Sequence, residues 1–186
     1  MRLQKLHFKK FADWFETYVR KNRGKDENIS PDICSISRGP NFFIKSYNGY
    51  ILNGVKFLSF EVSNLKKTQN HGVLVSATTS TYLKNPNDDP KIDDLSYHGT
   101  LQKVYEVCYG HDMLKYTMFH CKWYDGFKKD EFGLVSVKTS MPKYGEEPFI
   151  FAEQAKQCFY SIDPIESNRS FVLNRPHRQI FDVDDV

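Results

Sequence analysis

The sequence predicts one mostly β domain of the α+β class, in which an N-terminal amphipathic helix precedes a small, strongly bent antiparallel sheet or an SH3-like barrel. Three observations lead to this prediction. Apolar residues recur at helical spacing near the N-terminus. Short β-prone runs separated by turn signals follow from residue 42 onward. Aromatic side chains make up 15% of the 186 residues, enough material for one substantial core.

The predicted helix occupies residues 1–24. Its apolar positions lie three or four residues apart, the period of an amphipathic helix: Leu3, Leu6, Phe11, Trp14, Phe15, Tyr18 and Val19. Two opposite-charge pairs lie four residues apart on the other face: Lys9 with Asp13, and Glu16 with Arg20. Such pairs favour a solvated face, and Gly24 is the expected end of the helix. Because the helical pattern begins at the first residues, we expect the chain to be a piece of a longer protein.

A β-rich domain is predicted for residues 40–175. Asn48-Gly49 and Asn53-Gly54 are both strong signals for a two-residue hairpin turn. They lie only five residues apart, so one of them is expected to form a bulge or a looser turn. Further strands are expected at residues 55–62, 72–77, 101–109, 119–123, 132–138, 158–162 and 171–173.

The connections between these strands differ in character. Residues 78–96 are polar, rich in Asp and twice broken by proline, so we expect a flexible surface loop. Gly110-His111-Asp112 is the expected turn of the clearest hairpin. Residues 149–157 are expected to form a short helix, and residues 176–186 an acidic tail.

Cysteine usage and charge indicate the environment. Four widely scattered cysteines, Cys34, Cys108, Cys121 and Cys158, occur without a secretion signal, which favours reduced, buried thiols over disulfides. The net charge of +3 is mild, and no apolar run is long enough for a membrane helix. We therefore expect a soluble intracellular protein that does not bind a membrane.

No arrangement of residues in the sequence predicts catalysis. Cys108, His111, His120 and Cys121 resemble a zinc-ligand set, but neighbouring strand residues such as His120 and Cys121 point to opposite faces. The clustered acids fall in predicted loops or at the C-terminus, where solvated side chains are expected. Neither a nucleophile elbow nor a phosphate-binding loop is present in the sequence. We expect no enzyme activity, no cofactor and no metal.

Aromatic residues in and beside the predicted hairpin are the first candidate for binding. The candidate residues are Tyr97, Tyr105, Tyr116, Trp123 and Tyr124. Such rings can surround a methylated lysine through cation–π attraction or stack on single-stranded bases. Packing in the core is the alternative for each ring.

The basic N-terminal helix is the second candidate. Lys5, Lys9, Lys10, Arg20 and Lys21 are positioned to meet phosphates of DNA. Acidic residues on the same helix argue against this alternative.

Several sequence motifs occur in a particular order along the chain. They are GP at 39–40, YNGYILNGVKF at 47–57, KTQNHGV at 67–73, YHGTL at 97–101, FHCKWYD at 119–125 and EPFIFAEQAKQCFY at 147–160. Together they resemble a plant domain of unknown function that accompanies the transposase of En/Spm (CACTA) DNA transposons, over about residues 8–175.

This resemblance implies a biological setting without a mechanism. It implies an accessory module of a transposon protein, or of a gene derived from one, that works in the nucleus, with the cytoplasm as the alternative. The transposase of the same element is an implied partner, and the family supplies no catalytic residues. The leading hypothesis is a non-catalytic module that binds protein or chromatin through a β-barrel surface. The alternative is DNA binding through the basic helix.

Overall fold

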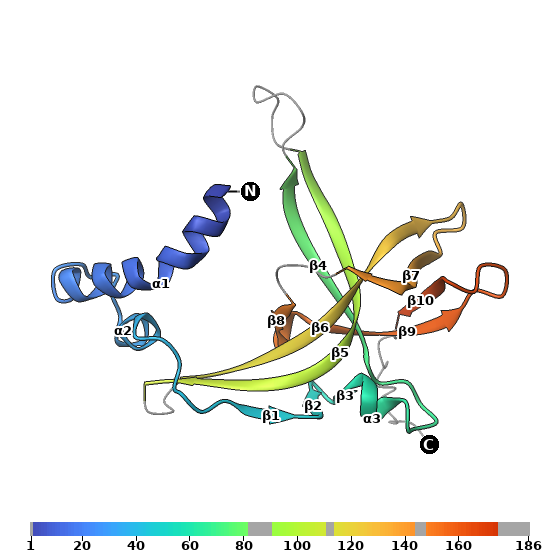
Figure 1. Cartoon of the computed structure of the whole chain (residues 1–186), viewed down its shortest axis with the longest axis horizontal. Helices are drawn as coiled ribbons and strands as arrows, with labels where there is room; N and C mark the ends of the chain where they lie inside the picture. The colour runs from blue at the N-terminus through green and yellow to red at the C-terminus, as the bar shows by residue number, and fades with distance from the viewer. Residues whose placement is uncertain (1, 82–90, 111–113, 144–147, 175–186) are drawn as a thin grey trace, which may run out of the picture. The chain divides into compact units, whose positions relative to one another are not determined.

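The computed structural model describes residues 2–81, 91–110, 114–143 and 148–174 (Figure 1). The chain divides into two compact units, which are described separately. The first comprises Met1–Ser46 and Tyr105–Met118, and the second comprises Tyr47–Val104 and Phe119–Val186. Within the described ranges, none of the helices has the length and apolarity that crossing a membrane requires.

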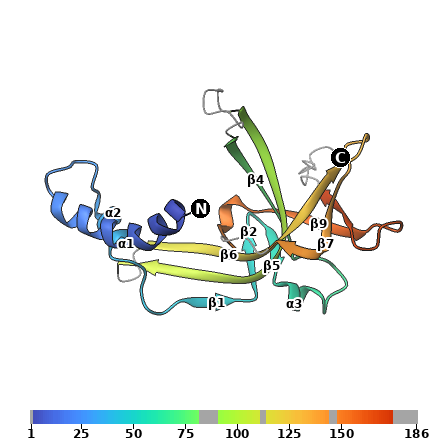
Figure 2. The same ribbon diagram turned by 45° about the horizontal axis from the view of Figure 1, so that its top comes forward.

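Two helices dominate the first unit and lie against each other (Figure 2). α1 (Arg2–Asn22) confirms the predicted N-terminal helix, and Gly24 follows it at φ +79°, a conformation that glycine adopts without strain. α2 (Pro31–Ser37) begins after Ser30, whose side-chain oxygen accepts a hydrogen bond from the Ile33 amide at 3.3 Å.

The charged residues of α1 were predicted to form a solvated face. Glu16 and Arg20 are exposed but do not pair within 4.0 Å, whereas the side chain of Lys9 lies outside the described residues. The exposure of both residues agrees with the predicted solvated face. Solvation of both side chains competes with pairing at an exposed helix position, where such a pair contributes only about 0.3–0.5 kcal/mol.

An eight-stranded sheet contains most of the described strands. They are β1 (Lys45–Tyr47), β4 (Gly72–Thr81), β5 (Lys91–Tyr109), β6 (Leu114–Lys129), β7 (Val135–Lys143), β8 (Phe149–Phe151), β9 (Lys156–Ile162) and β10 (Ser170–Asn174). Their order is β1-β5-β4-β9-β10-β7-β6-β8, and β5 also pairs with β6. This additional pairing closes a ring of six strands, in the order β5, β4, β9, β10, β7 and β6. The prediction of a mostly β chain with an N-terminal helix is confirmed.

A separate hairpin joins β2 (Gly49–Leu52) to β3 (Val55–Leu58), and α3 (Phe60–Ser63) follows it. Asn53 and Gly54 adopt φ values of 48° and 72°, as a type I′ turn requires. Gly49 instead begins β2. The expectation that only one Asn-Gly pair forms the tight hairpin is thus confirmed.

Two local predictions were wrong. A loop was predicted at residues 78–96, but both ends of this segment are strand. β4 and β5 remain paired there, from Ala77 opposite Leu95 to Thr81 opposite Lys91. Only residues 82–90 remain between the strands, and they lie outside the described residues. Instead of the predicted helix, residues 149–157 form β8, the single turn η1 (Ala152–Gln154) and the start of β9. β8 pairs with β6, and the start of β9 pairs with β4, so both ends of this segment are held extended.

Other predicted features fall partly or wholly outside the described residues. These are His111 and Asp112 of the hairpin turn, and the acidic tail at residues 176–186. The long hairpin itself is confirmed by the pairing of β5 with β6. All four cysteines are free and buried, which agrees with the prediction of reduced thiols.

Two hydrophobic clusters stabilise the second unit. The larger core consists of Phe57, Val73, Val75, Leu101, Val104, Phe119, Cys121, Ala152 and Ala155. The smaller core consists of Val137, Cys158 and Val172, with Leu74, Tyr124, Val135 and Tyr160 packed against it. Strand alternation separates them: Trp123 of β6 packs on the larger core, and its neighbour Tyr124 packs on the smaller one.

Candidate functional site

The five aromatic residues predicted to bind do not gather on one surface. Tyr97, Trp123 and Tyr124 belong to the second unit, whereas Tyr105 and Tyr116 are half-buried residues of the first. Trp123 and Tyr124 lie on opposite faces of β6. The rings of the second unit alone therefore lie on two opposite faces.

Two of these rings do share a face of the sheet. Tyr97, Gly99 and Leu101 alternate along β5, and Leu101 belongs to the larger core on which Trp123 packs. Tyr97 is 44% exposed and Leu95 38% exposed, while Trp123 is half-buried. We call Leu95, Tyr97 and Trp123 the aromatic face.

Gly99 makes this arrangement possible. A Cβ atom at position 99 would lie 2.7 Å from Cε3 of Trp123 and 2.6 Å from the carbonyl oxygen of Lys122. The indole ring thus lies directly against the β5 backbone, in space that any side chain at position 99 would take. Glycine at this position fixes where the Trp123 ring sits relative to Tyr97.

Tyr124 is half-buried and belongs to a group of hydrogen-bonded side chains beside the smaller core. Its hydroxyl lies 3.3 Å from Oγ1 of Thr100, and its ring meets that of Tyr160 edge-on at 5.4 Å. The Tyr160 hydroxyl donates to the carbonyl oxygen of Gly99 at 2.8 Å, and the Cys158 thiol donates to that hydroxyl at 3.6 Å. Tyr124 is therefore half-buried and packs against the smaller core, in line with the core-packing alternative for this ring.

Burial decides the protonation of this group. Desolvation raises the pKa of the Cys158 thiol to about 11, and it also raises the pKa values of Tyr124 and Tyr160. All three side chains are consequently neutral near pH 7. They can donate hydrogen bonds but do not supply a nucleophilic thiolate or phenolate there.

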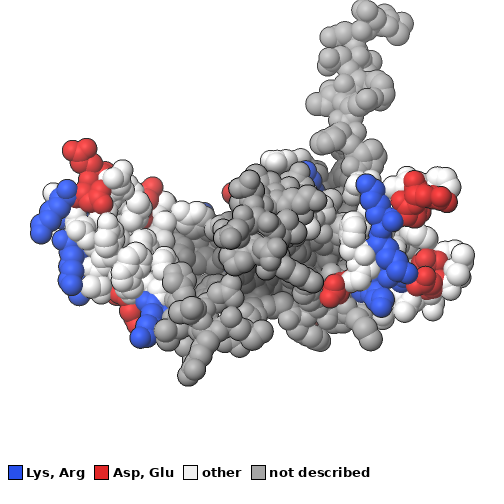
Figure 3. All heavy atoms as spheres, turned by 90° about the horizontal axis from the view of Figure 1, so that it is seen from above, with Lys and Arg blue, Asp and Glu red and all other residues white. Residues whose placement is uncertain are grey.

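The predicted DNA-binding residues lie on α1. Lys10, Arg20 and Lys21 are exposed, whereas the side chains of Lys5 and Lys9 lie outside the described residues. Figure 3 shows basic side chains on the helical part of the molecule, with acidic ones among them. The same helix exposes three aromatic rings in mutual contact: Phe11 lies 5.7 Å from Trp14, and Trp14 lies 5.4 Å from Tyr18.

The candidate zinc ligands do not form a metal site in the part of the chain that the structure describes. No group of three or more His, Cys, Asp or Glu side chains suited to a metal occurs among those residues, and His111 is not one of them. Cys121 is buried in the larger core, where desolvation raises the pKa of its thiol. His120, on the other face of β6, packs against Phe149 with 5.1 Å between the rings.

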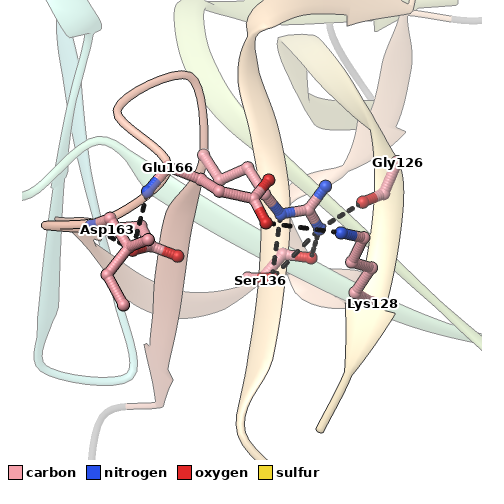
Figure 4. Close-up of polar contacts among 7 residues, drawn as sticks. Gly126, Lys128, Ser136, Asp163 and Glu166 are labelled. Carbon is pink, nitrogen blue, oxygen red and sulfur yellow. Dashed lines mark hydrogen bonds and ion pairs between the residues drawn. The ribbon is translucent and has the colours of Figure 1, made fainter.

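A polar network in the second unit is centred on Arg169, and Figure 4 shows its partners Gly126 and Ser136. The Arg169 side chain is 1% exposed. Its Nη2 atom donates to the Gly126 carbonyl oxygen at 2.6 Å and to the Ser136 carbonyl oxygen at 3.0 Å. Both Nη2 and Nε also donate to the Ser136 hydroxyl, at 3.0 and 3.2 Å. One guanidinium thereby joins β6, β7 and the segment between β9 and β10.

The acceptors of the Arg169 guanidinium are all neutral. Its Nη1 atom is buried and has no hydrogen-bond partner among the described residues. Backbone hydrogen bonds from Glu166 and Ile165 lower the pKa of the Asp163 carboxyl, and the charges of Arg169 and Lys128 lower it further. An arginine remains protonated at all ordinary pH values, so the network provides fixed positive charge and no proton transfer.

Sequence reasoning gave no reason to single out Arg169. It lies in Ser-Asn-Arg-Ser, a polar stretch typical of an exposed turn. Its partners are 33 and 43 residues away in the chain, so no local pattern reveals its burial.

One family model matches part of the chain. Residues 105–172 match a domain of unknown function, DUF4216, and this range includes Gly126, Ser136 and Arg169. Neither the curated proteins nor the solved structures contain a match to this chain.

Proposed function

We propose that this chain is a non-catalytic interaction module that binds protein or chromatin through the aromatic face. The supporting observation is the exposed ring of Tyr97 on the same face as the Trp123 ring, which Gly99 holds against the backbone. Both rings are amphipathic, because each combines a large apolar surface with one hydrogen-bonding group. Such residues are frequent at the centres of protein interfaces.

The ligand class follows from the chemistry of the rings. A tyrosine and a tryptophan on one face attract a cation, and a methylated lysine joins a cation to apolar methyl groups. Histone tails carry such lysines, so we propose chromatin as the partner. The sequence motifs support a setting in a plant CACTA-type transposon protein or a gene derived from one, with the nucleus as its location and the element's transposase as a further partner.

Binding of histone-tail peptides tests this function. The whole chain is titrated with unmodified and trimethyl-lysine peptides from histones H3 and H4, and affinity is measured by fluorescence anisotropy. We expect Tyr97→Ser to weaken peptide binding about fivefold, which corresponds to ~1 kcal/mol for one cation–π contact. Tyr47→Ser is the matched control, because Tyr47 is 43% exposed, close to the 44% of Tyr97.

Two outcomes would overturn the proposal. One is the absence of saturable binding to every peptide in the panel. The other is an equal loss of affinity in the Tyr97 and Tyr47 variants, because a general effect on the protein surface would then explain the result.

A second candidate function is DNA binding by α1. The observation that favours it is the exposure of Lys10, Arg20 and Lys21, none of which pairs with an acid in the part of the chain that the structure describes. Affinity for a short DNA duplex should then fall steeply with salt concentration. Replacing Lys10 and Lys21 with Gln should reduce that salt dependence, whereas Lys156→Gln on β9 should leave it unchanged.

A further inference from the structure

A cavity of about 310 Å³ lies within the first unit, between α1 and α2. Its lining residues come from the end of α1, from the turn that follows it and from α2: Glu16, Val19, Arg20, Arg23, Cys34, Ser37 and Arg38. Val19, Cys34 and Ser37 are the buried residues of this lining. The four charged lining residues are exposed.

The charges around this cavity are unbalanced. Three arginines face one acid, Glu16, so the formal charge of the lining is +2. In the described part of the chain, none of these guanidiniums lies within 4.0 Å of a carboxylate. A guanidinium presents five N–H donors in a planar fork.

The partial negative charges of the two helix C-termini do not account for all three arginines. α1 and α2 both end close to this cavity, and a helix C-terminus carries a partial charge of about −0.5. Two such ends could together favour about one positive charge. Three arginines exceed that amount even after Glu16 is included, which leaves an excess of positive charge in the lining.

We propose that this cavity binds the phosphate group of a phosphate monoester that carries a small organic group. A phosphate monoester has a charge of about −1.5 to −2 near pH 7, which is opposite in sign to the excess charge of the lining, and its oxygens fit the guanidinium fork in pairs. The cavity volume is at the lower end of the range of pockets for small organic ligands, about 300–1,000 Å³, so the cavity accommodates more than the phosphate itself. This inference goes beyond the protein-binding function proposed above and does not depend on it.

Two sources share this chemistry: a free mononucleotide and the phosphorylated 5′ end of a nucleic-acid strand. The probes are therefore adenosine monophosphate, adenosine, and one single-stranded oligonucleotide with either a 5′-phosphate or a 5′-hydroxyl. Binding to the whole chain is measured by isothermal titration calorimetry at constant ionic strength. A mononucleotide site binds adenosine monophosphate and not adenosine. A site for strand ends binds the 5′-phosphorylated oligonucleotide more tightly than either adenosine monophosphate or the 5′-hydroxyl form.

Substitution of the lining arginines tests whether the phosphorylated probes bind in this cavity. Arg23→Gln and Arg38→Gln should each weaken phosphate-dependent binding about tenfold, the loss expected for a charge-assisted hydrogen-bonded contact. Lys25→Gln removes the same charge from an exposed residue of the same unit that does not line the cavity, and it should leave the affinity unchanged. Thermal unfolding followed by circular dichroism verifies that each variant is folded.

Three results would overturn the proposal. The first is equal affinity for adenosine and adenosine monophosphate, together with no preference for the 5′-phosphate on the oligonucleotide. The second is the absence of saturable binding to any phosphorylated probe. The third is a loss in Lys25→Gln as large as that in Arg38→Gln, which would indicate diffuse electrostatic attraction.

Discussion

Arg169 binds Ser136 through both the backbone and the side chain of that serine. Its Nη2 atom lies 3.0 Å from the Ser136 carbonyl oxygen and 3.0 Å from the Ser136 hydroxyl oxygen, and Nε lies 3.2 Å from the same hydroxyl. The planar guanidinium presents these donors in a fixed arrangement that the single ammonium group of lysine does not reproduce. The position therefore requires the shape of arginine as well as its charge.

Replacing Arg169 with lysine should destabilise the protein by about 2–4 kcal/mol, because the buried carbonyl oxygens of Gly126 and Ser136 would lose donors. The free energy of unfolding is measured by urea denaturation with circular dichroism. Lys128→Met is the control, because Lys128 is exposed and its ion pair with Glu166, at 3.6 Å, is expected to contribute at most about 1 kcal/mol. Wild-type stability of Arg169→Lys would contradict the structural role assigned to this network.

Gly99→Ala should destabilise the protein by about 1–3 kcal/mol and displace the Trp123 ring. The added methyl group would lie 2.6–2.7 Å from the Lys122 carbonyl and the indole ring, and the paired strands restrict backbone movement. Urea denaturation measures the stability, and tryptophan fluorescence reports on the surroundings of the ring. Ser96→Ala, at an exposed position of the same strand, should change neither quantity. An unchanged emission spectrum in Gly99→Ala would show that Trp123 does not lie where the structure places it.

The features that sequence analysis predicted correctly depend on local geometry. The apolar spacing of α1 requires only its own residues, and the Asn53-Gly54 turn requires positive φ at two adjacent positions. The errors arose where distant pairing decides the structure. Residues 149–157 have a mixed apolar and polar pattern compatible with a short helix, but Gln157 pairs with Val73 of β4 and is therefore extended.

The same distinction applies to the candidate sites. Tyr97 and Trp123 were recognised because aromatic residues near a hairpin are visible in the sequence. Tyr124, the neighbour of Trp123, lies on the opposite face of β6 and packs on the smaller core. The α1–α2 cavity brings Arg38 together with Arg20 and Arg23 in its lining. No sequence motif contains these three positions, so the cavity could not be predicted from the sequence.

Cys121 and Cys158 should resist alkylation in the folded protein. Burial raises the pKa of both thiols, to about 11 for Cys158, so only a small fraction is present as the reactive thiolate at pH 8. Iodoacetamide labelling followed by peptide mass spectrometry should show both residues modified much more slowly than in urea-unfolded protein. Modification of either thiol at the unfolded rate under native conditions would contradict its burial in these cores.

Acidification from pH 7 to about pH 5 should lower the free energy of unfolding through His71 and His98. Both histidines are buried, and desolvation lowers their pKa values below the ordinary value of 6.5. Below pH 6.5 the unfolded chain therefore binds protons that the folded chain does not, and stability is lost as the pH falls. Each histidine contributes up to about 1.4 kcal/mol per pH unit until its folded-state pKa is reached.

Urea denaturation at a series of pH values, compared between the wild type and a His71→Gln, His98→Gln double variant, tests this effect. The variant should lose less stability between pH 7 and pH 5. The carboxyls of Asp26 and Asp163 do not interfere, because their folded-state pKa values are lowered below 3.8 and their contribution is lost only in stronger acid. His71 also contacts Oγ of Ser63 through Nδ1 at 2.9 Å, so the variant is expected to be less stable at pH 7 as well. The slope of stability against pH is therefore the decisive quantity, and an equal slope in both proteins would show that these histidines do not titrate as their burial requires.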